Sequence, residues 1–140
     1  MEDIIQLLHR GDYSCVISNQ NEVRTFLQRG VTDLYYLLSN DAAFLKGAYV
    51  ADKIVGKAAA ALMISGSVKK LYTDVISSPA LDLLRNTDIE ISYRKKVPFI
   101  INRDQTDWCP LEKLCYREGS VTAILPLITN FINENRKKTE

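Results

Sequence analysis

Two lysines and a carboxylate stand close together near the middle of the chain. Asp52, Lys53 and Lys57 follow Gly47 and come just before a run of alanines, Ala58 to Ala61. We predict that Gly47 to Ala61 form one helix, which continues to Ile64 and in which 3.6 residues per turn place Asp52, Lys53 and Lys57 on one side. Lys53 and Lys57 would be neighbours of like charge, which a helix tolerates when an anion lies between them. This side is therefore predicted to hold the phosphate or carboxylate of a small ligand, with Lys57 as base or nucleophile if it is desolvated.

The alternative to a ligand site is a solvated pair of lysines beside alanines that only fill the core. The dipeptide Gly56-Lys57 also invites comparison with a phosphate-binding P-loop. That motif requires a glycine where Ala51 stands, a serine or threonine where Ala58 stands, and a strand directly before the loop. The first two requirements fail, and Ile54-Val55 is predicted to be helical. We therefore exclude a P-loop.

Cys109-Pro110-Leu111-Glu112 is the second group of residues that could do chemistry. Proline in the first turn and glutamate two residues later predict the N-terminus of a helix, with Cys109 at the cap. The positive end of the helix dipole would lower the pKa of the Cys109 thiol and make it a nucleophile or a redox-sensitive group. No histidine lies nearby in the sequence to act as a base, so a capping or buried cysteine beside Trp108 is the simpler interpretation. Cys109 and Glu112 are assigned to the same pocket as Asp52, Lys53 and Lys57.

Arg103 is the third candidate, in the segment Asn102-Arg103-Asp104 that follows a short apolar run. Loops after strand ends are where ligands dock in α/β sheets, so Arg103 could hold an anion there. A salt bridge to Asp104 or Asp107 is the alternative, and the sequence does not choose between them.

The overall composition limits the classes of function that the chain can have. It has 140 residues, of which 46% are hydrophobic and 25% charged, as in an average soluble domain. A net charge of +1 gives no electrostatic reason to expect nucleic acid or an anionic membrane as a partner. No apolar run reaches the ~20 residues of a membrane span, and the N-terminus does not resemble a secretion signal. Three cysteines, an odd number at no framework spacing, favour the reducing cytoplasm.

The hydrophobic pattern predicts helices that alternate with strands after an initial β-hairpin. Helices are expected at residues 4–8, 32–38, 47–64, 77–84, 108–112 and 120–132, and strands at 14–18, 23–27, 68–76, 89–93 and 99–101. Ser77-Ser78-Pro79 is a clear helix start, with a serine cap and proline in the first turn. Pro126 is expected to kink the last helix or to mark its first turn. Helices that return between strands favour one three-layer α/β/α domain with a mixed sheet, spanning residues 1–140.

That order resembles the cytidine-deaminase-like fold, in which a hairpin is followed by a helix bearing His-x-Glu, a strand, and a helix opened by Pro-Cys-x-x-Cys. In this resemblance Ala51-Asp52-Lys53 takes the place of His-x-Glu. The segment Ser78 to Leu83 takes the place of Pro-Cys-x-x-Cys, with Ala80 and Leu83 where the two cysteines would stand. Three longer segments are similar to an uncharacterised, mostly bacterial family of unknown function within the deaminase-like superfamily: Leu45 to Ala60, Ile76 to Leu84, and Val97 to Glu112.

The resemblance implies the fold but not the zinc chemistry. Zinc deaminases hold the metal with three His or Cys ligands and use a separate glutamate to move protons. Alanine and leucine cannot bind zinc, and His9 is the only histidine of the chain. We therefore predict a domain without metal or other cofactor that binds a small anionic or nucleotide-like ligand, and that is an enzyme if Cys109 or Lys57 serves as nucleophile. The alternatives are a non-catalytic sensor that works through a homo-oligomer, and a protein-interaction module.

Overall fold

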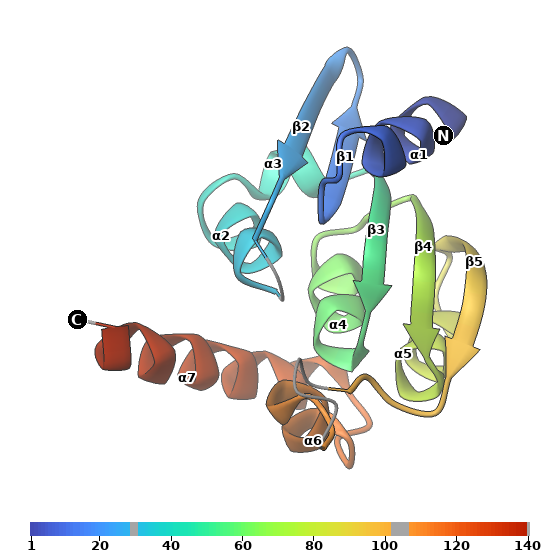
Figure 1. Ribbon diagram of the computed structural model, residues 1–140. Helices are drawn as coiled ribbons and strands as arrows, with labels where there is room; N and C mark the ends of the chain where they lie inside the picture. The colour runs from blue at the N-terminus through green and yellow to red at the C-terminus, as the bar shows by residue number, and fades with distance from the viewer. Residues whose placement is uncertain (29–30, 102–106, 140) are drawn as a thin grey trace.

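The computed structural model describes residues 1–28, 31–101 and 107–139 (Figure 1). Twelve elements follow one another along these residues: α1 (Glu2–Arg10), β1 (Cys15–Asn19), β2 (Glu22–Phe26), α2 (Thr32–Asn40), α3 (Ala42–Leu45), β3 (Tyr49–Val55), α4 (Lys57–Ser65), β4 (Lys70–Ser77), α5 (Ser78–Arg85), β5 (Glu90–Val97), α6 (Pro110–Cys115) and α7 (Val121–Thr139).

The strands form one mixed sheet in the order β2-β1-β3-β4-β5. β1 pairs antiparallel with β2 and with β3, whereas β3, β4 and β5 run parallel to one another. The three parallel strands therefore end at the same edge of the sheet, on the side where α6 lies in Figure 1. This predicted sheet type, a mixed sheet with helices, is confirmed.

Helices cover both faces of the sheet. Successive side chains of a strand point to opposite faces, and Val50 and Ala51 of β3 belong to two separate clusters of buried residues. Ala51 packs with Ile4 and Leu8 of α1. Val50 lies in the larger cluster, which includes the four buried alanines Ala58 to Ala61 of α4 together with residues of α2, α5 and α7. α1 thus covers one face alone, and the main core lies on the other face around α4.

The prediction of one helix from Gly47 to Ala61 is wrong. Tyr49–Val55 forms the central strand β3, and α4 begins only at Lys57. Gly56 separates the two elements in an extended conformation and is the N-cap of α4. β3 bonds to a strand on each side, and this long-range pairing overrides a local apolar pattern that strands and helices share. Asp52 and Lys53 consequently lie on a strand, so Lys53 and Lys57 are not neighbours on one helix.

The same error displaces the two positions taken from the deaminase resemblance. The helix that follows the hairpin is α2, and the helix after the next strand is α4 rather than α5. Ala51-Asp52-Lys53 therefore lies on neither helix. Because Ile54-Val55 ends a strand, one of the three grounds for excluding a P-loop is also wrong. The residues at Ala51 and Ala58 still exclude that motif.

Most other expected elements are confirmed. The hairpin, α2 and β4 form where the pattern places them, and Ser77 caps α5 by accepting a hydrogen bond from the backbone N–H of Ala80. β5 begins near the expected residue but continues to Val97, four residues beyond the expected end. In the described residues the apolar run 99–101 contributes an isolated bridge between Ile101 and Trp108 rather than a strand. Pro126 lies inside α7. No helix in the described part of the chain combines the length and apolar character needed to cross a membrane.

Candidate functional site

A groove of about 620 Å³ lies at the carboxyl ends of the parallel strands, where α4 and α5 begin. Its walls include Lys57 of α4, three polar residues on or just after α5, namely Ser78, Asp82 and Asn86, and Tyr116 directly after α6. The carboxyl edge of a parallel sheet is the usual place for ligands in α/β folds, because loops and helix N-termini converge there. The groove is therefore the first candidate for a binding site.

Lys57 brings a positive charge to this groove. It is the first residue of α4 and only 8% exposed. Its Nζ donates a hydrogen bond of 3.0 Å to the backbone carbonyl of Tyr116, and it forms no ion pair with a carboxylate of the described residues. An ammonium group has three donors, so two of them have no acceptor among the residues that the structure describes. Lys57 is thus a mostly buried cation whose Nζ contacts a backbone carbonyl and no carboxylate of the described residues.

Glu112 lies behind Lys57 and joins three segments of the chain. The side chain is 2% exposed. One carboxylate oxygen accepts from the backbone N–H of Lys57 at 2.9 Å and from Ser77 Oγ at 3.2 Å, and the other accepts from the backbone N–H of Ile100 at 3.1 Å. A negative charge at this position also complements the positive end of α4. Glu112 does not line the groove, so its contacts support a structural role, and its predicted role in binding a ligand remains a prediction.

Gly56 is tightly constrained by Glu112. A Cβ at this position would lie 2.9 Å from Glu112 Oε2 and 3.3 Å from a carbon of Ile100. We expect Gly56→Ala to lower the free energy of unfolding by about 1–3 kcal/mol, because the bonded carboxylate must move. Urea denaturation measures the change. Gly119→Ala is the matched control: its Cβ would meet no atom within 4 Å, and a similar loss there would contradict the steric explanation.

Cys109 is the N-cap residue of α6, as predicted, but its side chain makes no capping hydrogen bond. It is half-buried, its backbone N–H donates to the carbonyl of Ile100 at 2.7 Å, and it does not line the groove. Cys115 is fully buried, and burial, followed by the charge of Glu112, raises the pKa of its thiol to about 11. A thiol of that kind is unreactive at neutral pH. The nucleophilic role of Cys109 stays a prediction.

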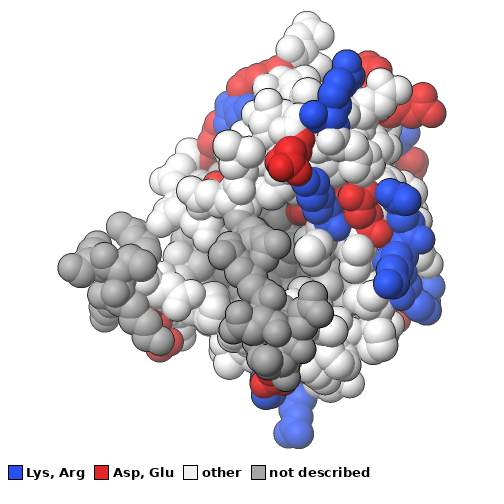
Figure 2. Space-filling model, viewed as in Figure 1, with Lys and Arg blue, Asp and Glu red and all other residues white. Residues whose placement is uncertain are grey.

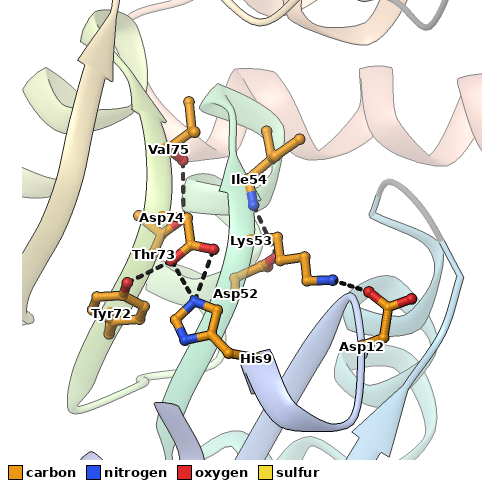
Figure 3. A network of polar contacts seen from close by, with 9 residues as sticks. All are labelled: His9, Asp12, Asp52, Lys53, Ile54, Tyr72, Thr73, Asp74 and Val75. Carbon is orange, nitrogen blue, oxygen red and sulfur yellow. Dashed lines mark hydrogen bonds and ion pairs between the residues drawn. The ribbon is translucent and has the colours of Figure 1, made fainter. Parts of the chain in front are cut away.

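Asp52 and Lys53 lie away from the groove. Lys53 points toward the α1 side, where its Nζ donates to Asp12 at 2.8 Å (Figure 3). Asp52 lies in register between Cys15 of β1 and Thr73 of β4, on the opposite face of the sheet from Lys53. Burial raises the pKa of Asp52 to about 7, against the lowering effect of the backbone N–H groups nearby. The structure thus brings Lys57 and Glu112 together but leaves Asp52 and Lys53 elsewhere. The remaining candidate, Arg103, lies outside the described residues.

His9 belongs to a polar cluster that the sequence did not indicate. Its Nε2 donates to both carboxylate oxygens of Asp74, at 2.8 and 3.0 Å, and the hydroxyl of Tyr72 donates to the same carboxylate (Figure 3). Burial and the Asp74 carboxylate raise the pKa of Tyr72 to about 12. The cluster ties α1 to β4. His9 and Asp74 are 65 residues apart, so no local spacing could have paired them.

The groove residues Ser78, Asp82, Asn86 and Tyr116 were also missed. The available signal was the position of Ser78 at a helix start directly after a strand, since such positions cluster at the ligand-binding edge of a parallel sheet. Among the described residues, no group of three or more His, Cys, Asp or Glu side chains is arranged to hold a metal ion.

Comparison with known proteins gives a family for this chain. The family model described as TM1506, domain of unknown function (DUF1893), matches residues 3–132. The structure is similar to the crystal structure, at 2.70 Å resolution, of a DUF1893 family protein (TM1506) from Thermotoga maritima. The TM-score is 0.85 at 26% identity, over 92% of this chain and 87% of that one. A search of curated proteins found no match. The chain therefore belongs to the DUF1893 family, whose description assigns it no function.

Proposed function

We propose that the groove beside Lys57 binds a small anionic ligand of the nucleotide-like class. The observation that carries this proposal is Lys57 itself: a mostly buried ammonium group that lines a groove without a carboxylate partner in the described residues. Burying a cation costs free energy unless an anion or several acceptors compensate. The carbonyl of Tyr116 offsets part of the cost of burying the Lys57 ammonium group. An anionic group of a ligand would offset the rest. A volume of about 620 Å³ is within the range of small-molecule sites.

The rest of the groove favours a planar, hydrogen-bonding ring as the other part of the ligand. Tyr116 is 48% exposed, and its ring is fixed from behind by edge contact with Trp108, with centroids 4.9 Å apart. An exposed, oriented aromatic ring is a surface on which a base can stack. Asp82 and Asn86 contribute acceptors and donors from α5 and its C-terminal end. An anion near Lys57 and a base near Tyr116 together describe a nucleotide-like molecule.

We further infer a distant relationship to the cytidine-deaminase-like fold. The observed order of hairpin, helix, strand and helix supports it, with α2 and α4 as the two helices that correspond to the zinc-binding helices of that fold. α4 begins Gly56-Lys57-Ala58, with no cysteine or histidine. In this interpretation Lys57 stands near the place where a deaminase holds its metal. The inference supports a ligand site at the start of α4 and does not support zinc-dependent deamination.

A titration of the intact protein with adenosine, adenosine monophosphate and inorganic phosphate tests the proposal. We expect the monophosphate to bind more tightly than adenosine, and Lys57→Met to weaken it by about 10- to 100-fold, because a charge-assisted hydrogen bond contributes about 1.5–3 kcal/mol. Isothermal titration calorimetry measures the affinity. Lys53→Met is the matched control, since Lys53 lies on β3 with its side chain on the α1 side.

Equal affinities for wild type and Lys57→Met would contradict the proposal. A binding loss shared by Lys53→Met would do the same, because it would point to general charge attraction. Chromatography of the ligand after prolonged incubation distinguishes a sensor from a metal-independent enzyme. A sensor leaves the ligand unchanged. An enzyme converts it, and the conversion requires Lys57 or Cys109.

A further inference from the structure

β5 is an edge strand whose outer side pairs with no other described residue. It stands last in the order of the sheet and pairs only with β4. Its length of eight residues equals that of β4, and most of its side chains are exposed. An unpaired strand of this length presents a row of free backbone N–H and C=O groups to any strand that can approach it.

The side chains along this edge carry an unbroken run of positive charge, Arg94, Lys95 and Lys96, which we name the basic β5 edge. Successive strand residues point to opposite faces, so both faces of the edge are charged. Arg94 contacts Tyr72 on the α1 side, whereas Lys95 and Lys96 form no ion pair within the described residues. Figure 2 shows basic side chains gathered on the side of the molecule where β5 lies.

At the opposite edge of the sheet, formed by β2, the basic side chain is paired within the chain. β2 is only five residues long, and its basic residue, Arg24, forms ion pairs with Glu22 and with Asp41, the latter at 2.9 Å. That charge is neutralised inside the chain. The basic β5 edge keeps most of its charge available to an external partner.

We propose that the outer edge of β5 binds an extended, acidic segment of another protein as an additional strand of the sheet. The backbone groups of β5 would supply the hydrogen bonds, as in other cases of strand addition. Carboxylates at successive positions of the incoming strand would face Arg94, Lys95 and Lys96 on the two faces, and opposite charges directly across a pair of strands stabilise it. Lysines on an edge repel neutral or basic strands, so the same residues would also select the partner.

Two other partners fit this edge less well. A second copy of the chain that paired through β5 would bring two runs of three cations together, and like charges across strands are destabilising. A nucleic acid could meet the charges of Arg94, Lys95 and Lys96, but it has no peptide backbone to pair with the N–H and C=O groups on the outer side of β5. An acidic peptide can place its charges only where the cations are.

The test uses the intact protein and a fluorescent peptide of eight residues, with three consecutive glutamates flanked by valines and threonines. The control peptide has the same sequence with alternate backbone nitrogens methylated, so that it keeps its charge but cannot form a ladder of hydrogen bonds. We expect fluorescence anisotropy to show binding of the first peptide, at least tenfold weaker binding of the second, and amide exchange that slows along β5. Affinity should fall as salt rises, because the charges are exposed.

The double variant Lys95→Glu/Lys96→Glu reverses both charges and should weaken peptide binding by at least tenfold. If charge reversal disturbs β5, the milder double variant Lys95→Gln/Lys96→Gln tests the same contacts and should also weaken peptide binding. The matched control is Lys46→Glu/Arg117→Glu, which makes the same change in net charge at exposed positions elsewhere. Four results would overturn the proposal: no binding, equal binding of the two peptides, equal losses in the two double variants, or tighter binding of a single-stranded RNA of matched charge. If the glutamine variant self-associates and the wild type binds no peptide, the proposal is also wrong. The lysines would then serve only to prevent aggregation through the edge of β5.

Discussion

Replacing Glu112 with alanine is expected to lower the free energy of unfolding by roughly 3–5 kcal/mol. The change leaves the backbone N–H groups of Lys57 and Ile100, and the hydroxyl of Ser77, without their acceptor in a buried site, and it opens a cavity beside them. Each unsatisfied buried donor costs about 1–3 kcal/mol, although the effects do not simply add. Small domains have only about 5–15 kcal/mol of stability, so this variant is expected to be close to its folding limit. Urea denaturation measures the loss.

A control and a second substitution separate the causes of this effect. Glu134→Ala removes an exposed glutamate from α7 and is expected to change stability by less than about 0.5 kcal/mol. Glu112→Gln keeps the volume of the side chain and one acceptor but sets an NH₂ group against a donor, so its loss should fall between those two variants. A loss below about 1 kcal/mol for Glu112→Ala would show that this carboxylate does not hold α4, α5 and the segment at Ile100 together.

The stability of the protein is expected to fall as pH rises from about 4 to about 7, and Asp52 is the cause that the structure identifies. Burial raises the pKa of Asp52 to about 7, while in the unfolded chain it titrates near 3.8. Between these values the folded chain holds a proton that the unfolded chain has lost, so each rise in pH favours unfolding. The loss is complete above about pH 7 and is on the order of 4 kcal/mol at most.

Asp52→Asn removes this titration and isolates its effect. At pH 8 the variant is expected to be more stable than wild type by about 2–4 kcal/mol, and at pH 4 the two should be nearly equal. Urea denaturation at several pH values measures both curves. Asp107→Asn is the control. Contact with Lys113 lowers the pKa of Asp107, so replacing Asp107 cannot remove a decrease in stability between pH 4 and pH 7. Parallel curves for wild type and Asp52→Asn would contradict the assignment to Asp52.

The parts of the fold that the sequence predicted correctly rest on local signals. Ser77 and Pro79 mark the start of α5 through capping chemistry that involves only nearby residues. The polar turn around residues 19–21 marks the hairpin in the same way. The helix predicted from Gly47 to Ala61 is wrong because a central strand and a buried helix can both consist mainly of apolar residues. Only the pairing of β3 with β1 and β4 distinguishes them.

The sequence placed two of the candidate residues, Lys57 and Glu112, close together, but partly for a mistaken reason. Lys57 and Glu112 were assigned to one pocket, and the structure places the Glu112 carboxylate 2.9 Å from the Lys57 backbone nitrogen. The assumed partners of Lys57 on a helix face, Asp52 and Lys53, lie on β3 instead. The walls of the groove come from α4, α5 and the segment after α6. These segments meet because of the strand order of the sheet, and the residue spacing within any one segment does not reveal that order.

Amide chemical-shift mapping of the ¹⁵N-labelled protein during titration with adenosine monophosphate tests the proposed ligand site most directly. Binding in the groove predicts that the largest changes occur at Lys57, Ser78, Asp82, Asn86 and Tyr116. It also predicts that these changes disappear in Lys57→Met while the rest of the spectrum is preserved. Changes centred on the β1–β2 hairpin or on the cluster of His9 and Asp74, or changes that persist in Lys57→Met, would contradict the assignment of the groove as the ligand site.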